Sequence, residues 1–502
     1  METIQSLLGG FAVALSGINL LFGFLGCLLG TVVGVLPGLG PAATISLLLP
    51  VVYAMNSPAT SLIFLAGIFY GSMYGGSTTS ILLNLPGEAA SVVTAIDGHE
   101  MAKKGRAGAA LSIAAIGSFI AGTVGVIGMS FIGPPVAELA LKFGAPEYFA
   151  LMVLGLLLAV FLTSGSPLKG CIMLFLGIFL ANIGIDPLTG RERFTFGTLE
   201  LMGGFDFVTI AMGMFGLSEI LLTLEKEVSS EFVTTKIGRL WPTAKDWMES
   251  KWAIIRGSII GFFVGVIPGG GAVVSSLVSY SVERKFAKHP EEFGKGAIAA
   301  VAGPESANNG ASSSSFIPLL TLGIPCNASI AMIYAALLVQ GITPGPFLLN
   351  DHPDVFWGVI ASMYIGNVIL VILNLPLVGV WVKLLKIPFG ILAPLIVMIT
   401  AVGCYSLENN MFNVFAFIGF GIFGYIVRKL DFEPGPLLMA FILSPLMENS
   451  LRQSLMLSQG SFSIFFTRPI SGSFMATFFI VIIWQFISKF RKSRKKGPVS
   501  FL

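Results

Sequence analysis

A run of glycines spaced four residues apart and ending in a Pro-Gly pair occurs twice in this chain. The copies match at one constant offset of 231 residues (257 minus 26): Gly26, Gly30, Gly34, Pro37 and Gly38 in the first, and Gly257, Gly261, Gly265, Pro268 and Gly269 in the second. A four-residue step keeps the glycines on one helical face, where another backbone can approach closely. Two such runs in register indicate a duplicated chain.

The proline and glycines that end each run are expected to stop the helix. These candidate break residues are Pro37, Gly38 and Gly40 in the first copy, and Pro268, Gly269 and Gly270 in the second. Each copy therefore predicts a close-packed helix, a non-helical break and a second helical segment.

Apolar segments of membrane-spanning length recur from end to end, for instance at 151 to 162. Charged residues make up only 11% of the 502 residues, against about 25% in soluble domains, and the mean hydropathy is +0.88. These features predict an all-α polytopic membrane protein with roughly 11–13 membrane segments. The net charge of +3 gives no sign of a nucleic-acid partner.

Motifs of the common enzyme classes are absent from the sequence. It contains no GxxxxGK[ST] loop, no HExxH and no GxSxG. The cysteines have no paired spacing, which argues against a metal site or a disulfide: Cys27, Cys171, Cys326 and Cys404. We therefore expect neither an enzyme nor a bound cofactor or resident metal.

Two polar stretches lie between apolar spans, at 74–91 and 303–329. Irregular backbone at membrane depth survives only where protein or a water-filled cavity surrounds it. The candidate substrate-binding residues are Ser77, Thr78, Thr79, Ser80 and Asn84 in the first stretch, and Asn308, Asn309, Ser312, Ser313, Ser314 and Ser315 in the second. Half-helix N-termini at such breaks suit a carboxylate, and oxygen-bearing side chains suit Na⁺. The alternative is that these small residues only permit tight helix packing.

Glu88 and Glu305 are the ionisable groups nearest the two polar stretches. An acid inside a membrane bundle is by default a functional-site hypothesis, so either could coordinate a coupling cation or carry a proton. The alternative is that each caps a helix N-terminus, since Glu88 follows Pro86-Gly87 and Glu305 follows Gly-Pro. Pro325 is a further candidate helix-break residue. Asp97, His99 and Glu100 are expected in a solvated loop.

The repeat is expected to span whole halves of opposite orientation. Ser312 to Ser315 follow Ser77 to Ser80 at an offset of 235 (312 minus 77), and Pro325 follows Pro86 at 239 (325 minus 86). Equivalent loops differ in charge: loop 97–106 is basic where 341–354 is acidic, and loop 51–58 is uncharged where 284–295 is basic. The positive-inside rule then predicts two inverted-topology repeats with broken helices or re-entrant hairpins.

This interpretation divides the chain into four parts. Residues 1–224 form the first transmembrane repeat, 225–256 a charged cytoplasmic linker and 257–448 the second, inverted repeat. Residues 449–502 add a C-terminal transmembrane helix and a basic tail, which is expected in the cytoplasm.

The chain resembles the large membrane subunit of the tripartite tricarboxylate transporters, the TctA family. The resemblance lies in GVLPGLGP (34–41), 74–111, FGAPEYFALMV (143–153), GFFVGVIPGGGA (261–272), 293–325 and ITPGP (342–346). It implies a multi-pass permease of the bacterial inner membrane that works with a small four-helix membrane subunit and a periplasmic substrate-binding protein. It also implies cation-coupled uptake of a carboxylate such as citrate, usually with Na⁺, although substrates vary within the family.

We thus expect a secondary-active importer that binds an organic acid anion between the paired polar stretches and works by alternating access. Replacing Ser312–Ser315 or Asn84 is expected to abolish uptake while leaving membrane insertion intact. A passive channel for small organic anions is the alternative, and it would need neither a cation gradient nor a binding protein. A third interpretation, an intramembrane serine hydrolase, lacks a His or Lys placed to activate a nucleophile.

Overall fold

The computed structural model describes residues 2–36, 40–162, 166–186, 188–225, 240–384 and 389–495. Within these residues the protein is helical apart from one two-stranded antiparallel hairpin, β1 (Gly184–Ile185) and β2 (Glu192–Arg193). Six described helical segments are long and apolar enough to cross a membrane: Gly17–Val35, Ala107–Ala140, Ala145–Leu162, Phe207–Glu225, Pro353–Asn374 and Met411–Lys429. The prediction of an all-α polytopic membrane protein is confirmed.

The helices before the charged segment run in chain order from α1 to α10. They are α1 (Glu2–Ala14), α2 (Gly17–Val35), α3 (Pro41–Tyr53), α4 (Pro58–Leu83), η1 (Ala89–Ser91), α5 (Val92–Lys103), α6 (Ala107–Ala140), α7 (Ala145–Leu162), α8 (Pro167–Ala181), η2 (Leu199–Leu201), α9 (Phe207–Ala211), the π-helical η3 (Met212–Leu217) and α10 (Ser218–Glu225).

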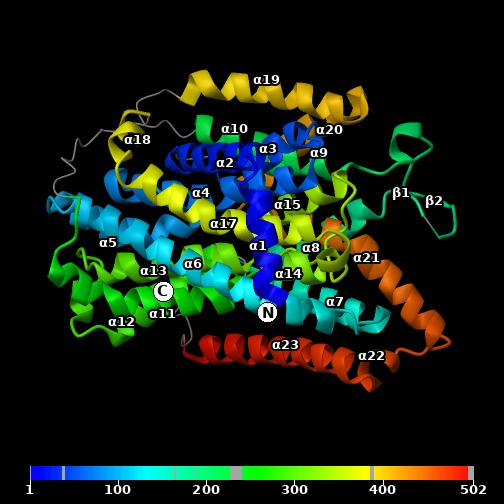
Figure 1. The fold of residues 1–502 in the computed structure, drawn as a ribbon. Coiled ribbons are helices and arrows are strands. Elements are labelled where there is room, and N and C mark those ends of the chain that lie inside the picture. The colour runs from blue at the N-terminus through cyan, green and yellow to red at the C-terminus, as the bar shows by residue number, and fades with distance from the viewer. Residues whose placement is uncertain are drawn as a thin grey trace, which may run out of the picture.

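The helices after it run from α11 to α23. They are α11 (Ala244–Val266), α12 (Gly271–Phe286), η4 (Pro290–Glu292), α13 (Ala299–Ser314), α14 (Phe316–Leu322), α15 (Ala328–Val339), α16 (Leu348–Asp351), α17 (Pro353–Asn374), α18 (Val378–Leu384), α19 (Phe389–Glu408), α20 (Met411–Lys429), α21 (Gly435–Leu457), α22 (Ile464–Thr467) and α23 (Pro469–Lys495). Figure 1 shows α4, α6, α13 and α17 running across the molecule with their axes in similar directions.

The two glycine runs lie in α2 and α11 and pack in the same way. In α2, a Cβ added at Gly30 would lie 2.5 Å from the Ile68 carbonyl oxygen of α4. In α11, a Cβ added at Gly261 would meet the Ala307 carbonyl oxygen of α13 and lie 2.9 Å from the Ala307 Cα. The neighbouring glycines of both runs meet the same partner helices four residues further along, so each run is a close backbone-to-backbone contact, as predicted.

This packing register corrects the predicted match between the serine clusters. Gly30 and Gly261 are 231 residues apart, whereas their partners Ile68 and Ala307 are 239 apart (307 minus 68). The offset of 239 also relates Pro86 to Pro325 at the breaks, so it holds along the whole partner helix. The serines of 312–315 therefore correspond to residues 73–76, one helical turn before the cluster with which the sequence had paired them.

Each partner helix is interrupted and then continues. After α4, Asn84 adopts the left-handed conformation (φ 57°), and the chain resumes as η1 and α5. After α14, Gly323 adopts the same conformation (φ 69°), and the chain resumes as α15. Both breaks are thus helix C-terminal turns followed by a proline and a new helix, as the predicted discontinuous helices require.

The two broken helices run in opposite directions. Lys104, which follows α5, donates a hydrogen bond to the carbonyl of Lys295, which precedes α13. At the other end, Gln340 after α15 donates to the carbonyls of Val52 and Met55 before α4 (2.6 and 2.9 Å). Since each helix starts where the other finishes, we infer that the two halves are inverted repeats.

The charged segment between the halves differs in part from the predicted linker. Residues 226–239 lie outside the described residues, but Ala244 already begins α11, so 244–256 form the first turns of the glycine helix. Thr243 and Asp246 make a reciprocal capping box at its start, and Asp246 also pairs with Arg106. Local capping chemistry explains why helix begins here despite the high charge.

Asp97 and His99 do not lie in a solvated loop, so that prediction is wrong. Asp97 is fully buried in α5, where its carboxylate accepts hydrogen bonds from the backbone N–H groups of Gly294, Gly296 and Ala297 and from the Tyr280 hydroxyl. Four donors compensate the carboxylate for the loss of water. Asp97 therefore ties α5 of the first half to the segment that leads into α13.

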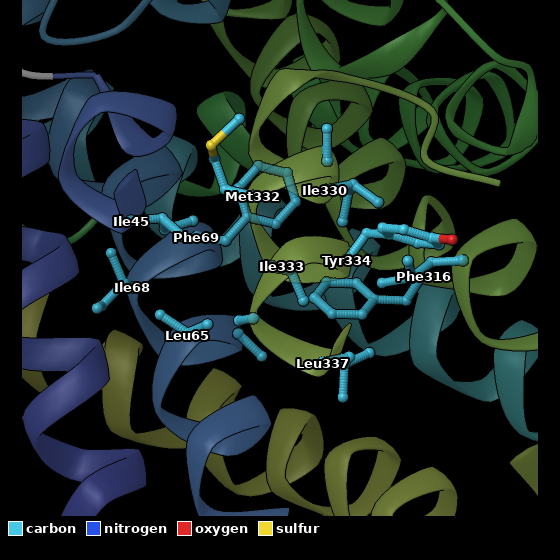
Figure 2. Close-up of a cluster of buried hydrophobic side chains, with 14 of the residues drawn as sticks. Ile45, Leu65, Ile68, Phe69, Phe316, Ile330, Met332, Ile333, Tyr334 and Leu337 are labelled. Carbon is cyan, nitrogen blue, oxygen red and sulfur yellow. The ribbon is translucent and has the colours of Figure 1, made fainter. Parts of the chain in front are cut away.

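The main hydrophobic core lies where the two broken helices meet. Figure 2 shows Phe69 of α4 on the side that faces α14 and α15, with Leu65 one turn away and Ile68 beside Ile45. From the second half come Phe316, Ile330, Ile333, Tyr334 and Leu337, all buried in the same cluster. This packing holds α4 of the first half against α14 and α15 of the second. The candidate polar residues Ser77 to Ser80 lie further along α4.

Candidate functional site

Glu305 lies at the centre of the contacts between the two polar stretches. It is the seventh residue of α13 and is fully buried. One carboxylate oxygen accepts a hydrogen bond from the Ser77 hydroxyl of α4 (2.6 Å), and the other accepts from the Thr94 hydroxyl of α5. The interpretation of Glu305 as a helix cap is wrong, because it lies inside a helix and its partners belong to the other half.

Glu88 combines both of the roles considered for it. It is the N-cap of η1, where one carboxylate oxygen accepts from the Ala90 N–H (2.5 Å) and Ser91 completes a capping box. Its other oxygen accepts from the Asn308 side-chain amide of α13 (3.3 Å). Glu88 thus caps a half-helix with one oxygen and reaches the opposite half with the other.

These two carboxyl groups have no basic partner among the ion pairs of the described residues, and both are buried (Glu88 6% and Glu305 0% exposed). A buried carboxylate is costly unless a proton or a cation neutralises it. The described residues contain no group of three or more His, Cys, Asp or Glu side chains that could hold a metal ion. The groups that could bind a cation here are instead two carboxylates together with hydroxyl and amide oxygens.

Several of the other candidate polar residues make hydrogen bonds to the backbone of their own helix or to a neighbouring helix, and Ser80 bonds to Ser91 across the first break. Ser312, Ser314 and Ser315 each donate to a backbone carbonyl three or four residues earlier in the chain. Thr79 donates to the Val35 carbonyl, which joins α4 to α2. The remaining members are also buried: Thr78, Ser80 and Ser313, while Asn309 donates to the Ser118 hydroxyl of α6. For these residues the packing interpretation fits the contacts better than the binding one.

The candidate break residues of the first half lie around Asn84 and at the start of α3. In the first half, Asn84 is the left-handed C-cap of α4, and Pro86 and Gly87 lead to Glu88; Gly87 packs against the Gly34 carbonyl and lies near the Gly76 Cα. Gly40 is the N-cap of α3, while Pro37 and Gly38 lie outside the described residues.

In the second half the two predicted breaks are brought together. The Gly269 N–H donates to the carbonyl of Cys326 (2.8 Å), which places the turn at Pro268, Gly269 and Gly270 beside Pro325. Gly269 has a φ of +78°, which favours glycine. The turn between α11 and α12 therefore lies against the break between α14 and α15.

Sequence reasoning missed Thr94 and Asn327. Asn327 is the N-cap of α15, and its side chain accepts from the Ile330 N–H (3.0 Å). It lies 239 residues after Glu88, the same offset that relates the two breaks, so the equivalent position could have been found from the repeat. The two half-helices are thus capped by an acid in the first half and by a neutral amide in the second. Thr94 carries no sequence signal, because it follows the polar stretch inside α5.

A separate ionic cluster lies beside the β1–β2 hairpin, at the end of the molecule opposite α5 and α12 (Figure 1). Arg193 pairs with Asp186 (2.7 Å) and Glu448 (2.9 Å), and Arg452 pairs with the same two acids. Residues of this cluster line a cavity of about 210 Å³. The Thr189 hydroxyl, aided by the Leu188 N–H and Arg193 and opposed by burial, holds the pKa of Asp186 well below its ordinary value.

We expect Asp186→Asn to loosen this hairpin at pH 7 and pH 5 alike. A depressed carboxyl pKa contributes stability that is full above about pH 4 and is lost as pH falls through the folded-state value. Native protection of residues 184–193 in hydrogen–deuterium exchange should therefore not change between these two pH values, and the variant should lose protection at both. Glu200→Gln, an exposed acid in the same loop, is the control. Equal exchange in D186N and native protein would contradict the assignment.

Comparison with known proteins identifies relatives over almost the whole chain. The family model described as the tripartite tricarboxylate transporter TctA family matches residues 20–439. An uncharacterized 52.8 kDa protein in the TAR-I ttuC' 3' region of Agrobacterium vitis is 52% identical over 496 residues, which cover 99% of each chain. An uncharacterized protein in the TAR-II ttuC' 3' region of the same organism is 51% identical over 234 residues, 47% of this chain and 97% of that one. No solved structure matches this chain.

Proposed function

Because the chain belongs to the tripartite tricarboxylate transporter TctA family, we propose that it is the permease that moves an organic carboxylate across a bacterial inner membrane together with Na⁺. Membership makes it a multi-pass membrane component of a tripartite transporter and not an enzyme. The proposed partners are a small four-helix membrane subunit and a periplasmic substrate-binding protein. The basic C-terminal tail is proposed to lie in the cytoplasm.

The observation that carries this proposal is the contact of two oppositely directed broken helices through buried polar groups. Ser77 and Thr94 of the first half bond to Glu305 of the second, and Asn308 of the second half bonds to Glu88 of the first. Inverted repeats with discontinuous helices are typical of secondary transporters, whose ligands bind where the helices break. Alternating access then follows if one half moves against the other and this set of contacts rearranges.

The substrate carboxylate is proposed to bind at the second break. A half-helix N-terminus attracts anions, but in the first half the carboxylate of Glu88 already occupies that position. In the second half Asn327 is neutral, and the turn at Gly269 and Gly270 lies beside the same break. The charge difference between the two caps therefore favours an anion at α15 and a cation beside Glu88.

The test is uptake of radiolabelled acids by cells that express all three components. Citrate, simpler dicarboxylates and aromatic acids should be compared in sodium and in choline medium, with cells lacking this chain as the blank. We expect at least one carboxylate to enter about tenfold faster with sodium, and only when the binding protein is present. Asn327→Asp, which adds a carboxylate at the second cap, should abolish this uptake by repelling the anion. Uptake of none of these acids, or unchanged uptake by N327D, would contradict the proposal.

A further inference from the structure

We propose that Glu88, Glu305 and Asn308 form a sodium site that joins the two halves, with the hydroxyl groups of Ser77 and Thr94 completing it. The assignment of this ion to transport rests on the proposed function. The existence of the site does not, because ion binding can be measured on the protein without any substrate.

One side chain of the cluster, Asn308, carries an oxygen without a hydrogen-bond partner among the described residues. Asn308 is fully buried, and its amide nitrogen is directed at the Glu88 carboxylate, yet its side-chain oxygen accepts no hydrogen bond from any described residue. Buried polar atoms almost always have a partner, so each exception calls for an explanation such as an ion. The Asn308 oxygen is one of eight such side-chain atoms among the described residues. Here the unpartnered oxygen belongs to the same side chain that bridges the two halves.

The charge of the cluster points the same way. Glu88 and Glu305 are buried without a basic ion-pair partner among the described residues, so two negative charges would face a low-dielectric interior. Asn308 lies one helical turn after Glu305 in α13, which brings its amide and both carboxyl groups into one neighbourhood. A cation bound there offsets the cost of burial.

The donor chemistry selects the class of cation. Every side chain in the cluster contributes oxygen: two carboxylates, one amide and two hydroxyls. Oxygen donors suit hard cations, whereas His and Cys ligands, which transition metals prefer, are not among these side chains. The set therefore suits a hard cation, and Na⁺ is the one named in the proposed function.

The position of the site gives the ion a mechanical role. Glu88 lies at the break between α4 and α5, Thr94 lies in α5, and both Glu305 and Asn308 lie in α13. An ion held by these residues links the first half, at its break between α4 and α5, to the interior of α13 in the second half. Its release would remove that link, which is how ion occupancy would bias one arrangement of the halves over the other.

The experiment measures binding of ²²Na⁺ and thermal stabilisation of the purified full-length protein in detergent, with sodium, potassium or choline chloride. We expect saturable ²²Na⁺ binding and a sodium-specific rise in Tm. Glu88→Gln and Glu305→Gln should lose both, and Thr94→Val, which keeps the side-chain shape, should bind about tenfold more weakly. Glu138→Gln removes an exposed carboxyl at the end of α6 and should behave as the native protein.

Three outcomes would overturn the sodium site: native protein that binds no ²²Na⁺, a Tm that depends on pH but not on the cation, or full binding by E305Q and T94V. Because T94V changes no charge, its result decides the matter even if the glutamate variants fold poorly. If sodium binds as expected but uptake of every acid ignores the sodium gradient, the site stands and the proposed coupling fails.

Discussion

Gly261→Ala is expected to destabilise the protein severely, and Gly30→Ala to do so by a similar amount. An added Cβ at Gly261 would meet the carbonyl oxygen and the Cα of Ala307, which are backbone atoms and cannot rotate away. Overpacking of this kind costs about 1–3 kcal/mol, and more where backbones must separate. Because α2 packs on α4 in the same way as α11 packs on α13, the two substitutions should lower the stability by similar amounts.

The measurement is the fraction of monodisperse protein left after heating detergent extracts. Gly419→Ala in α20 is the matched control, since no described atom beyond its own helix backbone and chain neighbours lies within 4 Å of the Cβ position there. Alanine favours helix over glycine by about 1 kcal/mol, so the control should be neutral or slightly stabilised. If G261A and G419A melt at the same temperature, the close-packed interface is contradicted.

Glu305→Gln is expected to reduce sodium-driven uptake by about 100-fold while leaving the protein folded. The carboxylate accepts a charge-assisted hydrogen bond on each oxygen, from Ser77 and Thr94. An amide has only one accepting oxygen and no charge, and hydrogen bonds to charged groups contribute about 1.5–3 kcal/mol each. A loss of about 2.7 kcal/mol corresponds to 100-fold in rate.

Uptake should be measured in proteoliposomes at matched protein content, which separates this effect from poor insertion. Ser312→Ala serves as the comparison within α13, because among the described residues its hydroxyl donates to the Asn308 carbonyl one turn earlier and has no other side-chain bond. Its uptake should fall by less than about threefold. A native rate for E305Q would exclude Glu305 from coupling, and a complete loss in S312A would restore the serine cluster as a binding element.

The repeat could be predicted from the sequence because glycine spacing and Pro-Gly pairs leave a pattern that does not depend on distant contacts. The helix–break–helix form at Gly257 to Gly269 and the discontinuity at Pro325 follow from local backbone chemistry. The serine pairing was wrong by one turn because serines repeat along 312–315, so residue identity alone cannot fix the register. The backbone contacts of Gly30 and Gly261 determine it, and they agree with the offset between Pro86 and Pro325.

The two glutamates of the site could be predicted from the sequence, but their hydrogen-bond partners could not. Glu88 and Glu305 stand out because a charge is rare at membrane depth. Their partners come from the opposite half, more than 200 residues away, and Thr94 is one ordinary threonine of α5. The burial of Asp97 was missed for the same reason, since its donors lie in the 294–297 segment. Tertiary contacts, not local pattern, decide these roles.

Accumulation of a carboxylate in proteoliposomes tests the central claim most directly. The complete transporter, with its binding protein outside, is given a tenfold inward sodium gradient and a radiolabelled acid that it takes up. Coupling to one sodium ion predicts an internal concentration up to about tenfold above the external one, which collapses when the gradient is removed. An internal concentration that only reaches the external value, with or without sodium, would contradict the account and indicate a passive channel.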